Sequence, residues 1–445
     1  MRRFHIMLAV LLALLVPGMA FAQVDFSRYV AMGDSLTAGF TSGSLNATYQ
    51  AWSFPAQLAG AFGVSDFQQP LVSPPGIPAI LQLRGLFPTV ILPASGQGVP
   101  LNLNLPRPYN NMGVPGATLH DLIATTTDNG GLHDLILRRQ GFTQLEEGLG
   151  LHPTFVTLWI GNNDVLGAAL SGRVIDGVTM TPVAQFQAML TTAVGAIAQS
   201  GAKMAIANIP DVTTIPFVNT LPIYIFNPQT NQPVLVNGHP IPFIGPNGPL
   251  QPGDYVLLTA SSELAQGKGI PVALGGSGQP LSDSVVLSAA EVAAIQARVN
   301  AFNAIIAGLA SQVGAALVDD HALLHQLESG FVPVGGIEFT GAFLTGGIFG
   351  YDGFHPTKIG YGFIANLFIE AINQKFGTKV PLVDLSKVMF SGSTTSALRS
   401  VHGDQGVTSF VFTEQAAASL RKALNVPTDA QINQILRRRG HHGHH

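Results

Sequence analysis

Four short stretches of this chain contain the residue types that a serine nucleophile needs. Such a serine requires a base that takes its proton, a carboxylate that orients the base, and hydrogen-bond donors for the oxyanion that forms during acyl transfer. Hydroxyl, imidazole, carboxylate and amide groups occur, each beside glycine or proline, in residues 32–39, 111–118, 161–164 and 352–356. The chemistry that these residue types could perform together is the hydrolysis of an acyl bond.

Each requirement has one candidate. Ser35 follows the apolar run 29–32, so we expect it at the carboxyl end of a strand, where open α/β sheets bind their ligands. His355 is the candidate base, and Asp352, three residues earlier on the same turn, can reach its imidazole. The candidate oxyanion donors are the backbone amides of Ser35 and Gly116 and the side-chain amide of Asn163.

Other residues near these candidates have simpler interpretations. We expect Asp34 to cap the helix that begins at Ser35. Asn163 could instead be a turn residue, and His355 a helix-entry residue before Pro356. His321 and His325 are one helical turn apart, but the glutamate that follows the first histidine of zinc peptidases is missing, so we expect ordinary structural histidines.

In their order along the chain, the four stretches resemble the signature blocks of the GDSL family of the SGNH hydrolase superfamily. The resemblance implies that Ser35 is the nucleophile and one oxyanion donor, that Gly116 and Asn163 are the other donors, and that Asp352 and His355 complete the triad. It also implies a flavodoxin-like three-layer α/β/α sandwich with a parallel sheet of about five strands. The chain has no Gly-x-Ser-x-Gly motif, which argues against the usual α/β-hydrolase route to this chemistry.

The N-terminus has the pattern of a secretory leader. Residues 1–22 contain Arg2 and Arg3, an apolar core over 6–16 and the small-residue sequence Ala-Phe-Ala at 20–22. We therefore predict removal before Gln23 and export to the periplasm or the medium. No later stretch is apolar for the roughly 18 residues of a membrane span, so we expect a soluble mature chain.

Composition excludes several classes of function. The 445 residues include no cysteine, which excludes disulfides, thiolate metal sites and a cysteine nucleophile. If Arg2 and Arg3 leave with the leader, the 21 basic residues become 19, against 25 acidic ones. This acidic balance argues against nucleic acid as a partner. Charged residues are only 10% of the chain, which predicts an unusually apolar surface.

Hydrophobic periodicity predicts alternating strands and helices, which is typical of a parallel sheet. The expected strands are 29–32, 155–160, 204–207 and 315–318. The expected helices are 46–62, 118–126, 132–139, 181–199, 288–312, which opens with a capping box, and 357–376. Short hairpins are expected over 223–258.

We assign residues 23–376 to one catalytic domain with long insertions at 69–108 and 215–287. The first insertion is rich in proline and glycine and is interpreted as a lid or binding loop rather than core. Residues 377–440 form a C-terminal extension that carries none of the chemistry above, with short helices at 414–424 and 430–436. The end of the chain, 437–445, includes a His-rich tail at 441–445 and is expected to be disordered.

These features together predict an exported serine ester hydrolase that needs no metal or organic cofactor. Low charge and apolar insertions favour a lipid or short-chain carboxylic ester as substrate, with peripheral lipid contact an open possibility. A carbohydrate O-acetyl esterase and a lysophospholipase or thioesterase are alternatives within the same class. A catalytically inactive surface-binding module is the alternative from another class, and the oligomeric state stays open.

Overall fold

The computed structural model describes residues 24–85, 89–139, 141–227, 230, 232–391 and 410–442. The predicted leader and the last three residues of the His-rich tail lie outside the described residues.

Four parallel strands form the central sheet, in the order β1-β4-β5-β14. The strands are β1 (Tyr29–Gly33), β4 (Phe155–Trp159), β5 (Lys203–Ala207) and β14 (Ala316–Val318). Along the outer edge of β1, the Ala31 N–H donates to Asn110 O at 2.8 Å and the Met112 N–H donates to Ala31 O at 2.9 Å. Residues 110–112 therefore lie where a fifth strand would, which accounts for the difference from the expected five strands.

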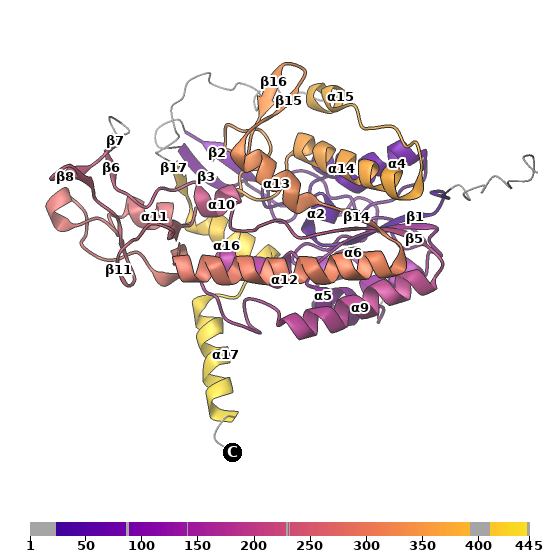
Figure 1. Ribbon diagram of the computed structural model, residues 1–445, viewed down its shortest axis with the longest axis horizontal. Helices are drawn as coiled ribbons and strands as arrows, with labels where there is room; N and C mark the ends of the chain where they lie inside the picture. Colours follow the sequence, from indigo (N-terminus) through magenta and orange to yellow (C-terminus); the bar gives the residue numbers. More distant parts are fainter. Residues whose placement is uncertain are drawn as a thin grey trace, which may run out of the picture.

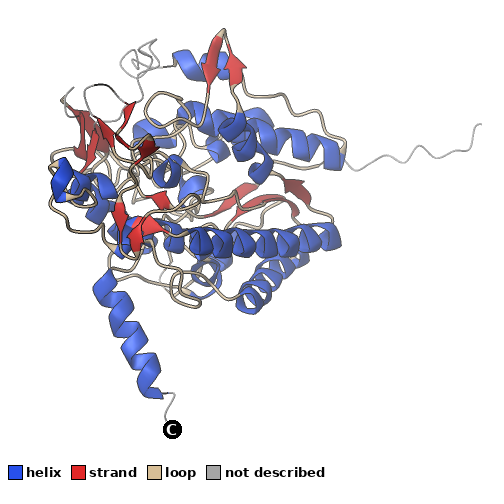
Figure 2. Cartoon of the chain, turned by 60° about the vertical axis from the view of Figure 1, so that its left-hand side comes forward, coloured by secondary structure: helices blue, strands red, loops and turns tan. Residues whose placement is uncertain are grey.

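Alternate residues of each strand face opposite layers of the sandwich, as the two-residue period of a strand requires. On one face Tyr29, Phe155 and Trp159 pack with α4 (Phe54–Phe62) and α14 (Lys358–Phe376). On the other face Met32, Leu158 and their neighbours pack with residues of α9 (Val183–Gln199) and α12 (Ala289–Val313). The sheet is thus buried on both sides between two helical layers (Figures 1 and 2). The predicted three-layer α/β/α fold is confirmed.

The predicted helices are present, with one interruption. Residues 46–62 form two helices, α3 (Ala47–Gln50) and α4, because Ser53 caps a new helix that starts at Phe54. The predicted capping box of α12 is present, with Ser288 and Glu291 bonded to each other's backbone N–H. The other helices of this part of the chain are α2 (Ser35–Ala38), α5 (Leu119–Ala124), α6 (Leu132–Ile136), α7 (Gln144–Leu149) and α8 (Asn163–Ser171).

The first predicted insertion contributes to the core, which corrects its interpretation as a loop outside it. It contains β2 (Leu81–Arg84) and β3 (Thr89–Pro93), which pair antiparallel. Val72, Leu81 and Ile91 are buried in the main hydrophobic core. A third strand, β17 (Phe410–Phe412), pairs parallel with β3 and comes from the C-terminal extension. The sequence pattern does not reveal this pairing, because its partner lies at the other end of the chain.

Short hairpins fill the second predicted insertion, as expected. They lie at one end of the molecule, on the left in Figure 1. Their small core includes Ile225, Phe243 and Leu281. The elements here are α10 (Pro216–Asn219), β6 (Phe226–Asn227), β7 (Gln232–Pro233), β8 (Leu235–Val236), β9 (His239–Pro240), β10 (Ile244–Gly245), β11 (Gly248–Pro249), β12 (Tyr255–Val256), α11 (Ala260–Ala265), the 3-10 turns Val272–Leu274 and Asp283–Val285, and β13 (Val286–Leu287).

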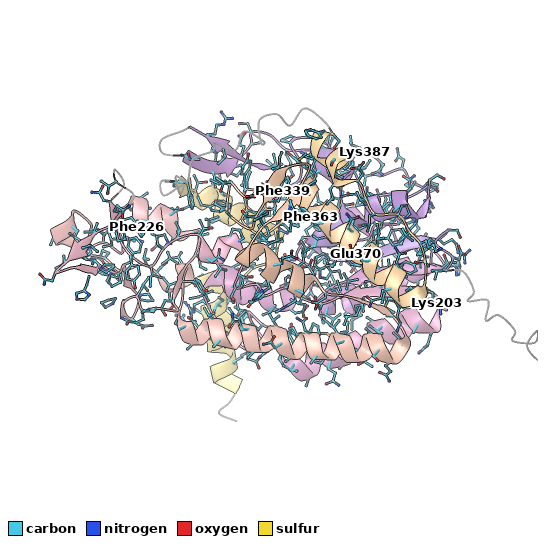
Figure 3. All side chains as sticks on the ribbon, turned by 45° about the horizontal axis from the view of Figure 1, so that its top comes forward. Lys203, Phe226, Phe339, Phe363, Glu370 and Lys387 are labelled. Atoms are coloured by element: carbon cyan, nitrogen blue, oxygen red, sulfur yellow. The ribbon has the colours of Figure 1, made fainter. Side chains whose placement is uncertain are left out.

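A hairpin and two helices cover the outer side of α14. These elements are α13 (Asp320–Ser329), β15 (Val332–Val334), β16 (Ile337–Phe339) and α15 (Leu385–Phe390). Phe339 of β16 and Phe363 of α14 meet edge to face with ring centroids 6.1 Å apart, and both are labelled in Figure 3. This contact attaches the hairpin to the helix that follows His355.

The chain ends in two helices, α16 (Glu414–Ala423) and α17 (Asp429–His442). Helix α17 projects from the body of the molecule (Figure 2). The expectation of disorder from residue 437 is therefore wrong for residues 437–442, which continue α17. Arg439 anchors this helix by donating to the Gly177 carbonyl at 2.7 Å.

One described helix, α12, has the length and hydropathy that a membrane crossing needs. This differs from the expectation that no stretch after the leader is apolar enough. Its buried residues recur every three or four positions, and Arg298 forms an ion pair with Asp176 at 2.8 Å. Since helices that flank a core meet the same criterion, α12 is weak evidence for a membrane span.

Candidate active site

Ser35 lies where β1 ends and α2 begins. Asp34 caps α2 through its side chain, as expected, accepting from the Leu36 N–H at 3.0 Å. Its other carboxylate oxygen accepts from the Asn162 side-chain amide at 2.8 Å. Ser35 is 3% exposed. The serine is thus held at the carboxyl end of the sheet, next to the strand that leads to Asn163.

Asp352 and His355 form a buried hydrogen-bonded pair. Asp352 Oδ2 lies 2.8 Å from His355 Nδ1, and the two side chains are 0% and 1% exposed. The other carboxylate oxygen accepts from the backbone N–H of His355 at 3.0 Å. With Nδ1 held by the carboxylate, Nε2 of the ring is the nitrogen left for a serine hydroxyl. The predicted Asp352–His355 contact is present, and a direct Ser35–His355 hydrogen bond stays a prediction.

Several hydrogen bonds connect the turn after Ser35 with the segment that carries His355. The Gly43 N–H donates to Asp352 Oδ2 at 2.6 Å, and the Thr41 hydroxyl donates to the Pro356 carbonyl at 2.6 Å. The Tyr361 hydroxyl donates to the Phe40 carbonyl at 2.6 Å. The rings of Phe40 and His355 meet edge to face at 4.9 Å. Two segments about 310 positions apart are therefore fixed against each other.

The candidate oxyanion donors Gly116 and Asn163 lie beside each other. One N–H of the Asn163 amide donates to the carbonyl of Ala117 at 2.9 Å, directly after Gly116. An amide nitrogen has two N–H bonds, so the second can donate to a substrate oxygen. Gly116 has φ of +80°, a conformation that favours glycine.

Asp164, for which the sequence pattern predicts no role, links the segment after Gly116 to its surroundings. Its carboxylate accepts from the Leu119 N–H at 2.8 Å and from the Thr181 hydroxyl at 2.7 Å. Burial raises the pKa of this carboxyl to about 7, although both hydrogen bonds lower it. Burial likewise raises the pKa of Asp34 to about 6, against the lowering effects of its hydrogen bonds and of nearby His355. An acid directly after Asn163 is visible in the sequence, but its burial is not.

The C-terminal extension, which the sequence predicts to carry none of the chemistry, packs on the candidate site. A Cβ placed on Gly116 would lie 2.8 Å from the backbone Cα of Leu424. Phe412 packs edge to face against Phe217, which packs in the same way against Phe354, the neighbour of His355. No sequence motif predicts these contacts, because they depend on the pairing of β17 with β3.

A cavity of about 210 Å³ begins at the candidate oxyanion donors. Its lining includes Gly116 and Asn163 together with Leu424 and the three residues after it. The remaining lining comes mainly from the loop between α8 and α9 and includes Val178, Thr179, Met180, Thr181, Pro182 and Gln185. The cavity therefore lies between the segment of Gly116 and the C-terminal extension.

The model of the GDSL-like lipase/acylhydrolase family matches residues 29–368. The chain belongs to this family. The match includes all five candidate residues and both predicted insertions, and ends within α14, so it leaves out the C-terminal extension. Membership identifies the chain as a GDSL hydrolase, in a family named for lipases and acylhydrolases. Comparison with curated protein sequences gives no significant match.

Solved structures similar to this GDSL hydrolase include two esterolytic or lipolytic enzymes. An acetylxylan esterase from Geobacillus stearothermophilus is 12% identical, with a TM-score of 0.36, over 80% of this chain and 97% of its own. An extracellular lipase from Streptomyces rimosus is 15% identical, with a TM-score of 0.33, over 78% of this chain and 98% of its own. An α/β hydrolase from the metagenome of Lake Arreo, Spain, is 16% identical, with a TM-score of 0.35, over 78% and 94%.

Within the described residues of this GDSL hydrolase, no three His, Asp or Glu side chains are grouped so that they could hold a metal ion. His321 and His325 lie on α13, away from the Asp352–His355 pair in sequence. The Asn208 side-chain oxygen accepts from the backbone N–H of His321 at 3.0 Å, so this hydrogen bond attaches the start of α13 to the residue that follows β5.

Proposed function

We propose that this GDSL hydrolase is a serine carboxylic ester hydrolase that works through an acyl-enzyme on Ser35. The observation that carries the proposal is the buried Asp352–His355 hydrogen bond of 2.8 Å, fixed against the turn that follows Ser35. A carboxylate bonded to one ring nitrogen holds the imidazole in the tautomer that can accept a proton at the other. This arrangement is the part of a catalytic triad that activates a serine.

In the proposed reaction, Ser35 Oγ attacks the ester carbonyl carbon while His355 Nε2 takes the hydroxyl proton. The carbonyl oxygen becomes an oxyanion that accepts from the amides of Ser35, Gly116 and Asn163. The C–O bond to the alcohol then breaks, and His355 gives its proton to the leaving oxygen. Water, deprotonated by His355, attacks the acyl-enzyme, releases the carboxylic acid and returns the proton to Ser35. These protein groups complete the cycle without a cofactor.

Labelling with a fluorophosphonate tests the nucleophile. We expect the wild type to bind one equivalent and to hydrolyse nitrophenyl esters, and Ser35→Ala to lose both properties while keeping its circular dichroism spectrum. The matched control is Ser277→Ala, because Ser277 is exposed in an insertion loop and should leave labelling intact. An unlabelled and inactive wild type would instead favour the inactive binding module.

We further propose that the chain is exported and that residues 23–376 form its catalytic domain, extended by residues 377–440. The charged start, apolar core and Ala-Phe-Ala sequence of residues 1–22 support export. Expression with the full leader should yield a mature chain that begins at Gln23, measured by N-terminal mass spectrometry of the periplasm and medium. A chain that keeps Met1 in the cytoplasm would contradict this.

A further inference from the structure

We propose that the C-terminal residues Leu424–Pro427 form the outer wall of the acyl-binding cavity and limit this hydrolase to esters of short acyl chains. The inference rests on the proposed function and adds the substrate class to it. Its starting point is the cavity of about 210 Å³, which is lined by Gly116 and Asn163 and by these four residues.

The position of the cavity assigns it to the acyl group rather than the alcohol. The leaving alcohol must face the imidazole that protonates it, whereas the acyl chain extends from the carbonyl carbon in another direction. The cavity is lined by two candidate oxyanion donors, Gly116 and Asn163, but neither by Ser35 nor by any residue of the 350–356 segment that carries His355. A chain that continues from the carbonyl carbon past these two donors would enter this cavity, and for that reason we assign it to the acyl group.

The size and polarity of the cavity favour a short acyl chain. A cavity of roughly 150 Å³ in another protein holds a six-carbon ring, so about 210 Å³ suits a chain on the order of six carbons or fewer. The lining also carries carboxyl, hydroxyl and amide groups, among them Asp121, Asp164, Thr181 and Gln185. Burying a hydrocarbon chain gains less free energy against polar groups than against apolar ones, so this lining suits a long chain poorly.

The wall is built into the fold. Leu424 and Val426 are 3% and 7% exposed, and both belong to the main hydrophobic core. The Val426 N–H donates to the Arg421 carbonyl at 2.9 Å, which attaches the wall to the end of α16. The backbone of Leu424 packs so closely on Gly116 that a side chain there would collide with it. The wall therefore keeps its place while substrate binds.

Behind the wall lies a larger cavity of about 760 Å³, between α16 and the second insertion. Asn425, Val426 and Pro427 line both cavities. Removing side-chain volume from the middle of this partition should extend the acyl site toward the larger space. Val426 is the residue to change, because its side chain is apolar and lies between the two cavities.

The test compares kcat/KM for nitrophenyl acetate, butyrate, octanoate and dodecanoate. We expect the wild type to prefer acetate or butyrate. Val426→Ala should raise the octanoate-to-acetate ratio by about tenfold, since one methylene in an apolar pocket changes discrimination by about that factor or more. Val426→Ile, which adds a methylene, should lower the same ratio. Two opposite shifts keep the test decisive even if one variant folds poorly.

The matched control is Val388→Ala, because Val388 is 2% exposed and lies in α15, outside both cavities. It loses the same volume and should keep the wild-type chain-length profile. The proposed limit on chain length would be contradicted by a wild type that prefers dodecanoate. It would also be contradicted if the Val426 variants had the same chain-length profile as Val388→Ala. Failure of the proposed function itself would give a different result: the wild type would hydrolyse none of the esters and would not react with the fluorophosphonate.

Discussion

Asn163 uses one N–H to hold the loop that carries Gly116 and leaves the other for a ligand. The side chain therefore has both a structural and a proposed catalytic role. The two roles separate experimentally, because the first affects stability and the second affects kcat.

We predict that Asn163→Ala lowers kcat by about 10²- to 10³-fold, the range measured when one oxyanion donor is removed. KM should change much less, because the lost hydrogen bond strengthens only as the oxyanion forms. Steady-state kinetics on nitrophenyl butyrate measures both values. Asn247→Ala, in an exposed turn of the second insertion, is the control. A variant that keeps wild-type kcat would remove Asn163 from the oxyanion site.

At the residue scale, local spacing predicted the Asp352–His355 contact and the Asp34 cap. Asp352 and His355 are three residues apart, so their contact needs one turn of backbone and no distant partner. The cap formed by Asp34 is local for the same reason. Gly43, whose N–H also binds the Asp352 carboxylate, could not be found in this way. Its contact depends on how two distant segments fold together.

At the scale of elements, β17 connects the C-terminal extension to the rest of the molecule. Phe410, Val411 and Phe412 pair with Thr89, Val90 and Ile91 of β3. Phe412 is fully buried, and its N–H donates to the Ser261 hydroxyl at 2.8 Å. One short strand thus contacts both predicted insertions.

Phe412→Ala should lower the free energy of unfolding by about 3 kcal/mol or more, because it leaves a cavity where a buried ring was. Urea unfolding followed by circular dichroism gives this value. The matched control is Phe390→Ala, since Phe390 is 70% exposed and its loss should change stability by about 0.5 kcal/mol or less. Equal effects of the two substitutions would show that β17 is not integrated into the core.

The elements of the central sandwich were predictable because their patterns are local and strongly periodic. Strand β4 is apolar except for Thr157, and α12 begins with a capping box. The insertions and the extension were harder to interpret. Strand β17 and the hairpin strands of the second insertion have only two or three residues each, too few to show a clear period. Strand β3 of the first insertion pairs with β17, which is far away in sequence.

On the scale of the whole molecule, buried carboxyls make stability depend on pH. Burial raises the pKa values of Asp34 to about 6 and of Asp164 and Asp320 to about 7. For Asp320, neighbouring Asp319 raises the pKa further. An unfolded chain loses these protons near pH 4, whereas the native chain keeps them to higher pH. The native state thus binds more protons between these values, and its stability falls as pH rises from about 4 to 7.

We predict that Asp320→Asn weakens this pH dependence. At pH 8 the variant should be more stable than the wild type by on the order of 2 kcal/mol, because it no longer needs to bury a charge. At pH 4, where the native carboxyl is protonated, the difference should vanish. Urea titrations at both pH values measure it. Glu370→Gln is the control, because Glu370 is exposed on α14 (Figure 3). Equal gains at both pH values would contradict the prediction.

The pairing of β17 with β3 also sets the order in which the molecule can be completed. The Thr413 hydroxyl and the Ile91 carbonyl that it binds are 322 positions apart, so a ribosome finishes one partner long before it makes the other. While the chain emerges, the loop of Gly116 has no Leu424 against it, and the proposed acyl cavity lacks its proposed wall. Assembly of the proposed acyl cavity therefore has to wait until residues 424–427 have been made.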